Sequence, residues 1–329
     1  MGIWDIFTPE DQILSIDFNN PLRIIYAGRK KNKIFIKNAL EENLPEDVFQ
    51  MGQVINSELI INILRERLKN WRIKKAKVLL SIPAQNVVVR FINFPYMPES
   101  EVKEALRWEL EKYVPFPVED VYYDFQILDT IERERNKEYR LLLVAAPSET
   151  IRLYLDIVNK VGLNPELIDI SPFSAIRSVI KERKEVPNEV TLFIFSRYRF
   201  VDMVISKDKK PFFFRTISTK SWFEDKELDD LSKSYLLEDY LKEIQNNINL
   251  FYLQYPDVRI EKLILLGDNV LNKDFIELLE AMLGLTAEIS PLSLTELGIQ
   301  MKNKNIISIF QDQLPKWVVP LGLLIWGEV

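Results

Sequence analysis

The side chains that this sequence offers for chemistry are limited by two absences. No cysteine and no histidine occur among its 329 residues. A Ser-His-Asp triad, a Cys-His pair and a zinc or iron site with histidine or thiolate ligands are therefore excluded. Carboxylates, lysines, tyrosines and hydroxyl groups remain. This restriction shortens the list of possible enzyme classes considerably.

The distribution of charge argues against a general nucleic-acid binder. The net charge is −6 and the pI is near 5.2, whereas such binders are usually basic. Basic residues nevertheless gather in three runs, at residues 29–33, 72–77 and 207–210. The first and third runs separate strand-like stretches and are predicted to be exposed hairpin turns. Contact with an anionic membrane surface is the alternative.

No segment of the sequence is expected to enter or cross a membrane. Residues 1–15 have neither the basic start nor the long apolar run of a signal peptide. The apolar residues 317–326 are about half the length of a membrane-spanning helix, and they include Pro320 and Gly322. We predict a buried terminal helix or strand there. The protein is expected to be cytoplasmic and to reach the inner face of the cell membrane only through partners.

The order of predicted elements is similar in two parts of the chain. Each part opens with a β-meander, continues into helices, and includes a short apolar strand, at residues 78–82 and 262–266. The polar segment 181–188, KERKEVPN, separates them. We place the first half at residues 1–187 and the second at residues 188–329. Duplicated α/β halves around a cleft are what an actin-like fold requires.

Residues 94–128 form the most informative stretch. Pro98 suits the first turn of a helix, and Pro115 and Pro117 cannot continue one. Between them an apolar face recurs at three- and four-residue steps. Its members are Val102, Ala105, Leu106, Leu110 and Tyr113. The stretch is therefore predicted to be a loop, an amphipathic helix, a Pro-Phe-Pro stop and a strand.

The sequence of this stretch resembles that of the PilM family, the actin-like cytoplasmic protein of type IV pilus assembly. In that family a helix carries W-E-x-E-x-Y-x-P-F-P and leads into a D-F-x-x-L strand. Further segments are similar at residues 142–177, 243–252 and 319–324, so the resemblance spans nearly the whole chain. The residues that match the first motif are Trp108, Glu109, Glu111, Tyr113, Pro115, Phe116, Pro117, Asp124, Phe125 and Leu128.

The resemblance implies an α/β fold of the actin-like class, with RNase H-like duplicated halves. It also implies a small inserted α+β subdomain of the 1C type, known from the relative FtsA, at about residues 85–143. The C-terminal segment, about residues 305–329, is expected to return to the first half.

The family binds ATP between its halves, where backbone N–H groups in tight, glycine-containing turns hold the phosphates. Its first two turns read D-I-G-S-S and D-I-G-A-S, whereas this chain has DFNNP at residues 17–21 and IFSRY at residues 194–198. The third turn is reduced to residues 267–269. The residues left to form a degenerate nucleotide cleft are Asp17, Asn19, Asn20, Ser196, Gly267 and Asp268.

We therefore expect weak or absent ATP binding, no hydrolysis, no catalytic residue and no resident metal. Three altered turns could together remove roughly 3–6 kcal/mol of binding free energy. Asp17 could still hold a magnesium ion through water, although an isolated aspartate at a strand end is more often a turn former. Alternatively, Arg197 or Arg199 would fill the phosphate region and make the cleft a fixed hinge.

The resemblance also implies a partner. The family binds the short N-terminal cytoplasmic tail of PilN, a bitopic membrane protein, whose apolar I-N-L-L-P motif docks in a groove beside the inserted subdomain. Such recognition needs aromatic walls and free backbone edges. The predicted partner-binding residues are Tyr96, Trp108, Tyr113 and Phe116, although aromatic residues at helical spacing usually fill a core.

Three functions remain open from the sequence. We favour a nucleotide-independent adaptor of the pilus platform that recruits a PilN-like protein. The alternatives are an actin-like ATP-binding protein whose assembly is switched by nucleotide, and a cytoplasmic component of a type II secretion platform. Other platform proteins, the cytoplasmic motor ATPases and further copies of the chain are possible partners, and nucleic acid is not expected.

Overall fold

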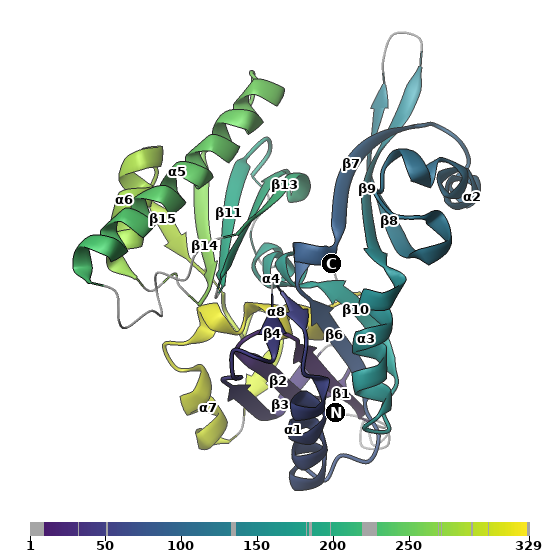
Figure 1. Ribbon diagram of the computed structural model, residues 1–329, viewed down its shortest axis with the longest axis vertical. Coiled ribbons are helices and arrows are strands. Elements are labelled where there is room, and N and C mark those ends of the chain that lie inside the picture. Colours follow the sequence, from purple (N-terminus) through teal and green to yellow (C-terminus); the bar gives the residue numbers. More distant parts are fainter. Residues whose placement is uncertain are drawn as a thin grey trace.

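The computed structural model describes residues 10–327 except 32, 51, 133–135, 182, 184–185, 198, 219–228, 269, 271, 291 and 302. Tyr198 and Asn269, which belong to the predicted nucleotide turns, therefore lie outside the described residues. Two sheet-centred halves lie side by side, and a smaller unit projects from the first of them (Figure 1).

The first half is built on a six-stranded sheet in the order β10-β6-β1-β2-β3-β16. An antiparallel meander of β1, β2 and β3 forms its centre, and β6 and β10 continue it in parallel with β1. Its strands are β1 (Asp11–Asp17), β2 (Leu22–Lys30), β3 (Lys33–Glu42), β6 (Lys77–Ile82), β10 (Pro165–Ile170) and β16 (Ile299–Met301). A short hairpin of β4 (Phe49–Gln50) and β5 (Gln53–Val54) lies outside the sheet.

Strand alternation explains how both faces of this sheet become buried. Leu14 and Ile16 of β1 join a core with α1 (Ser57–Asn70) and α3 (Ser148–Asn159). Ile13 points to the other face, where α7 (Lys304–Phe310) and α8 (Val318–Leu324) complete a second core. The first half is thus a three-layered α/β/α unit.

The second half repeats this plan with a five-stranded sheet in the order β13-β12-β11-β14-β15. The inner stripe of α5 is buried against this sheet with α6, and comprises Leu237, Leu241, Ile244, Ile248 and Phe251. The elements are β11 (Val190–Arg197), β12 (Phe200–Lys207), β13 (Lys210–Ser218), α5 (Asp230–Gln254), β14 (Lys262–Gly267), α6 (Lys273–Leu283) and β15 (Ala287–Ile289).

The insert is a three-stranded antiparallel sheet with one helix on it. Its strand order is β7-β9-β8, with β7 at Val88–Pro95, β8 at Val121–Glu132 and β9 at Lys137–Pro147. The α2 helix covers Glu99–Glu109 and buries Val102 and Leu106. It ends before Tyr113, the last residue of the predicted apolar face, because Leu110–Lys112 tighten into a 3-10 turn ahead of the prolines.

The C-terminal segment lies on the first half, from β16 onward. Ser15 of β1 donates to the carbonyl of Pro320 at 2.8 Å, and α8 packs along α4 (Ser171–Ile180). A Cβ at Gly322 would lie 1.7 Å from the carbonyl oxygen of Ser174, so only glycine permits this approach. Among the residues that the structure describes, no helix is long and apolar enough to span a bilayer.

Candidate functional site

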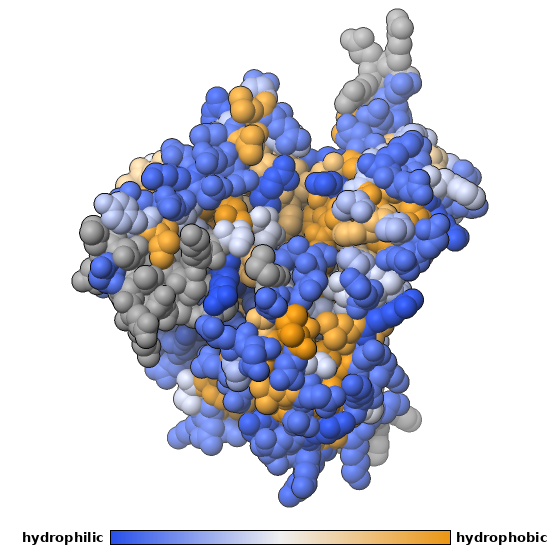
Figure 2. Space-filling view, viewed as in Figure 1, coloured by the Kyte–Doolittle hydropathy of each residue, from blue (hydrophilic) through white to orange (hydrophobic). Residues whose placement is uncertain are grey.

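A groove of about 720 Å³ opens where the insert meets both halves. We call it the insert groove. The first half supplies β10 and α4, the insert supplies β8 and β9, and the second half supplies the β12–β13 hairpin. Apolar side chains on the insert gather beside the second half (Figure 2). Lining residues include Tyr122, Gln126, Leu128, Leu142, Val144, Ala146, Leu167, Ile168, Ile170, Phe173, Ile176, Val204, Pro211 and Trp326.

Alternation along β9 explains why one face of the insert sheet is available to the groove. Leu141, Leu143 and Ala145 point to α2 and fill the insert core. Leu142 and Val144 point the other way and line the groove. A continuous apolar run such as that of β9 is typical of a strand covered on both faces. Here the insert core under α2 covers one face of β9, and the groove lies on the other face.

Two sheet edges border the insert groove. In the described part of the chain, β8 pairs only with β9, and β10 pairs only with β6. Each edge therefore leaves a row of backbone N–H and C=O groups without a strand partner. An extended peptide in the groove could pair with either edge while its side chains enter the apolar walls.

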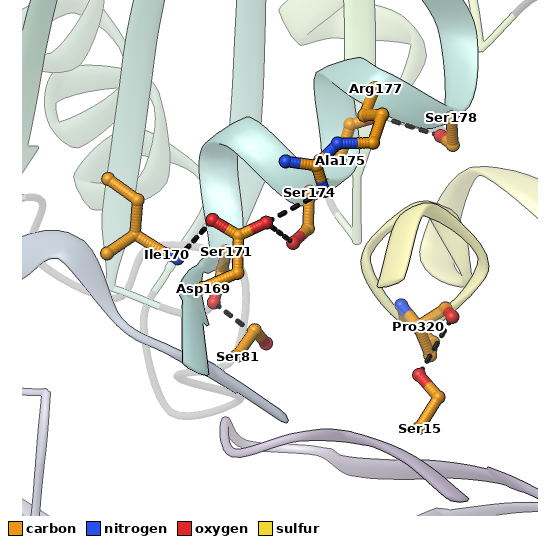
Figure 3. Close-up of polar contacts among 10 residues, drawn as sticks. All are labelled: Ser15, Ser81, Asp169, Ile170, Ser171, Ser174, Ala175, Arg177, Ser178 and Pro320. Atoms are coloured by element: carbon orange, nitrogen blue, oxygen red, sulfur yellow. Dashed lines mark hydrogen bonds and ion pairs between the residues drawn. The ribbon is translucent and has the colours of Figure 1, made fainter. Parts of the chain in front are cut away.

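A fixed charged pair marks the end of β10 (Figure 3). Asp169 Oδ2 accepts hydrogen bonds from Arg177 NH1 at 2.7 Å and from Ser174 Oγ at 2.6 Å, and its Oδ1 accepts from the N–H of Ile170 at 2.8 Å. Both charged side chains line the groove. The carboxylate also lies just before the N-terminus of α4, where the helix dipole favours it. The groove thus has one oriented polar point in an apolar lining.

The second half is tied to the insert beside the groove. Lys210 Nζ lies 2.6 Å from Asp129 Oδ1, and Arg140 NH2 lies 2.5 Å from the other oxygen of the same carboxylate. The Arg140 guanidinium also lies 5.9 Å from the centre of the Phe212 ring. The β12–β13 hairpin therefore forms a third wall of the groove that depends on the position of the second half.

The four aromatic residues predicted to bind the partner do not line the insert groove. Tyr113 and Phe116 are half-buried against the core under α2, Tyr96 packs on Tyr139 at 4.9 Å, and Trp108 is 82% exposed on α2. All belong to the α2 side of the insert. The sequence signal that could have located the groove is the apolar run of β9, which carries apolar side chains on both faces of the strand.

The predicted nucleotide cleft lies at the end of β1. Asp17 is 1% exposed and accepts hydrogen bonds from Ser81 Oγ at 2.8 Å and Ser171 Oγ at 3.3 Å. Burial raises the pKa of its carboxyl, and the positive charges of Arg197 and Arg23 oppose this shift. Asp17 is therefore already engaged by hydroxyl groups.

Two buried arginines occupy the cleft. Arg23 of β2 pairs with Glu41 at 2.7 Å and reaches across to Asp268 of the second half. Arg197 pairs with Asp202 at 2.7 Å, and both side chains are at most 2% exposed. Arg199, by contrast, is half-exposed and pairs with Glu46 at 3.4 Å. Of the two arginines proposed to fill the phosphate region, Arg197 is the one inside.

The remaining predicted cleft residues serve the fold locally. The side chain of Asn20 donates to the carbonyl of Leu44 and accepts from its N–H, both at 3.0 Å. Gly267 has a φ of +101°, and a Cβ there would lie 2.1 Å from the carbonyl oxygen of Ser196. That carbonyl accepts the N–H of Asp268 at 2.9 Å. Asn19 closes its turn through an N–H to the carbonyl of Asp17 at 3.0 Å.

A bound phosphate needs backbone donors and a cation. Among the described cleft residues, Arg23 pairs with Glu41 and Asp268, and Arg197 pairs with Asp202. Among the described residues, no three acidic side chains lie together as a metal site.

Comparison with known proteins agrees with this architecture. A family model described as "Type IV pilus assembly protein PilM" matches residues 16–203. The structure of a "PilM-PilN type IV pilus biogenesis complex" superimposes with a TM-score of 0.82 at 23% identity, covering 97% of this chain and 99% of that chain. The predicted fold class, an actin-like α/β fold of the kind PilM has, is confirmed.

Two further structures are more distant. A Bacteroides thetaiotaomicron protein with an actin-like ATPase fold and unknown function gives a TM-score of 0.49 at 10% identity, covering 87% of this chain and 94% of that chain. Ethanolamine utilization protein EutJ from Carboxydothermus hydrogenoformans gives 0.49 at 12% identity, covering 97% and 90%.

Proposed function

Because this chain belongs to the PilM family of type IV pilus assembly proteins, we propose that it is a cytoplasmic scaffold that holds the N-terminal tail of a PilN-like membrane protein in the insert groove. The tail would bind as an extended apolar segment. The scaffold would be recruited to the inner face of the membrane by this partner and would work without nucleotide.

The observation that carries the proposal is the pairing of an apolar groove with two open strand edges. Main-chain hydrogen bonds to β8 or β10 would supply affinity that does not depend on the sequence of the tail. Val144, Ile168 and Phe173 offer apolar contacts for alternate side chains. Residues 122–128 of β8 run beside the groove, so a tail of about seven residues would span roughly 23 Å.

The ion pairs in the cleft support independence from nucleotide. A bound phosphate would have to compete with Asp268 for Arg23, and removal of one partner from a buried pair costs about 3–5 kcal/mol. A magnesium ion would likewise have to draw Asp17 away from Ser81 and Ser171. The two halves would therefore keep one relative position, and with it the hairpin wall of the groove.

The direct test is titration of the purified protein with a fluorescent synthetic tail of the INLLP type. Two matched groove variants, Val144→Arg and Ile168→Arg, should each weaken binding at least about tenfold, because they place a charge in the apolar lining. Leu253→Arg makes the same kind of change on α5 at a residue that is 80% exposed, and it should bind like the wild type.

Trp108→Ala separates the groove from the aromatic residues that the sequence indicated. It should leave tail affinity unchanged, because Trp108 lies on the α2 side of the insert. Folded groove variants that bind as tightly as the wild type would contradict the proposal. A fluorescent ATP analogue with magnesium tests the other part, and saturable micromolar binding would restore the nucleotide-switched alternative.

Other platform proteins, the motor ATPases and further copies of the chain would contact surfaces outside the groove. Trp108 on α2 and Leu253 on α5 are exposed there, and large aromatic residues such as Trp108 often dominate interfaces. Their substitution should change such assemblies without changing tail affinity.

A further inference from the structure

Two basic turns meet at the end of the first sheet that faces away from the insert. We call them the basic rim: Lys30, Lys31, Lys33, Arg72, Lys74 and Lys75. In the sheet register, Arg29 lies opposite Asp11, Lys30 lies opposite Lys33, and Lys77 lies beside Ile13. The β2–β3 turn and the loop before β6 are therefore brought to one edge, although about 40 residues of sequence separate them.

The carboxylates near this edge are engaged by other cations. Asp11 and Glu166 pair with Lys77 at 3.3 Å and 3.8 Å, and Glu10 pairs with Lys37 at 2.8 Å. No ion pair within the described residues holds Lys33, Lys74 or Lys75, and all three are exposed. The rim is thus strongly positive on a chain whose net charge is −6.

We propose that the basic rim docks on the surface of a bilayer that contains anionic phospholipid. The cations come from separate turns and spread over three strand spacings, about 15 Å, which suits a planar charged surface. The choice of a bilayer over another acidic surface rests on the proposed function, since a membrane-anchored partner would hold the chain there.

The position of the groove agrees with this orientation. Pro165, the first residue of β10, pairs with Val78 near the rim, and Leu167, Ile168 and Ile170 line the groove. The rim and the far end of the groove are therefore one six-residue strand apart, about 20 Å. A tail paired antiparallel with the open edge of β10 would leave the groove toward the rim, with its membrane-bound C-terminal end near Pro165.

The interaction is expected to be electrostatic. Each lysine or arginine near an anionic surface contributes roughly fivefold in affinity, and the attraction falls off within a Debye length of about 8 Å at physiological ionic strength. Binding should therefore be strong at low salt and weak at high salt.

The test is flotation of the full chain with vesicles of phosphatidylcholine alone or of equal parts phosphatidylcholine and phosphatidylglycerol. We expect at least about tenfold preference for the anionic vesicles. Lys33→Glu, Lys74→Glu and Lys75→Glu combined should abolish this preference. The matched control combines Lys103→Glu, Lys112→Glu and Lys242→Glu, which lie on α2, after it and on α5, and should retain it with the same net charge.

Equal flotation with neutral vesicles, or equal loss in both triple variants, would overturn the proposal. Rim-dependent binding to duplex DNA without binding to anionic vesicles would assign the rim to nucleic acid and overturn it too. The tail titration without vesicles is a separate measurement, and the rim variant should bind the tail like the wild type. The two measurements therefore distinguish a failure of the proposed tail binding in the groove from a failure of the proposed membrane docking by the basic rim.

Discussion

Arg23 and Asp268, which lie 245 positions apart in the sequence, form a partly buried ion pair between the two halves. Arg23 is 3% exposed and also holds Glu41 at 2.7 Å. The pair lies among the residues of the predicted nucleotide cleft, and it connects the two halves within the chain. The groove depends on this connection, because its hairpin wall belongs to the second half.

Arg23→Ala should destabilise the protein by about 3–5 kcal/mol, since it leaves Glu41 and Asp268 without their buried cation. Urea unfolding of the variant and wild type at neutral pH measures the change. Lys160→Ala is the matched control, because Lys160 pairs with Glu58 at an exposed site and should cost less than about 1 kcal/mol. Similar losses of unfolding free energy in both variants would show that the cleft pair stabilises the protein no more than an exposed pair does.

Asp17→Asn should gain stability relative to the wild type as the pH rises. Burial raises the folded pKa of Asp17 above its ordinary value of 3.8. A carboxyl of this kind stabilises the folded state fully below its unfolded pKa, and this contribution is lost as pH rises through the folded pKa. Asparagine does not ionise, so the difference in unfolding free energy should grow from about pH 4 upward. A difference that stays level or shrinks between acid and neutral pH would contradict this account.

The fold class could be predicted from the sequence because local patterns carry it. The motif around Trp108, the apolar strands and the polar segment at residues 181–188 are all read within short windows. The groove could not be located in this way. Its lining joins β8, β10 and the β12–β13 hairpin, and strand alternation decides which face of β9 each side chain reaches.

The contacts within the predicted nucleotide cleft could not be predicted from the sequence either. The sequence shows that the first two turns lack the glycines of the family pattern, but no local pattern predicts that Arg23 pairs with Asp268. Asn20 was likewise predicted to belong to the nucleotide cleft, whereas its side chain forms hydrogen bonds with the backbone of Leu44. Pairings across such sequence separations depend on the tertiary fold.

Gly322→Ala should destabilise the contact between α8 and α4 by roughly 1–3 kcal/mol, because the new methyl group meets the carbonyl of Ser174 at 1.7 Å. Since α4 lines the groove, the tail should also bind more weakly. Gly284→Ala is the control. That position has open space but a φ of +66°, so it should cost about 1 kcal/mol and leave tail affinity unchanged. Unchanged tail affinity in a folded Gly322→Ala variant would show that α4 tolerates the shift.

The direction of the bound tail can be measured with photo-crosslinking probes at its two ends. Because β10 runs from the basic rim toward the insert, an antiparallel tail places its N-terminal probe near Ile170 and Phe173 and its C-terminal probe near Pro165 and Glu166. Mass spectrometry of the crosslinked peptides locates both. The Ile168→Arg variant should lose both crosslinks, which controls for labelling outside the groove. A reversed pattern would mean a parallel tail, whose membrane-bound end would leave on the insert side and could not bring the rim to the bilayer.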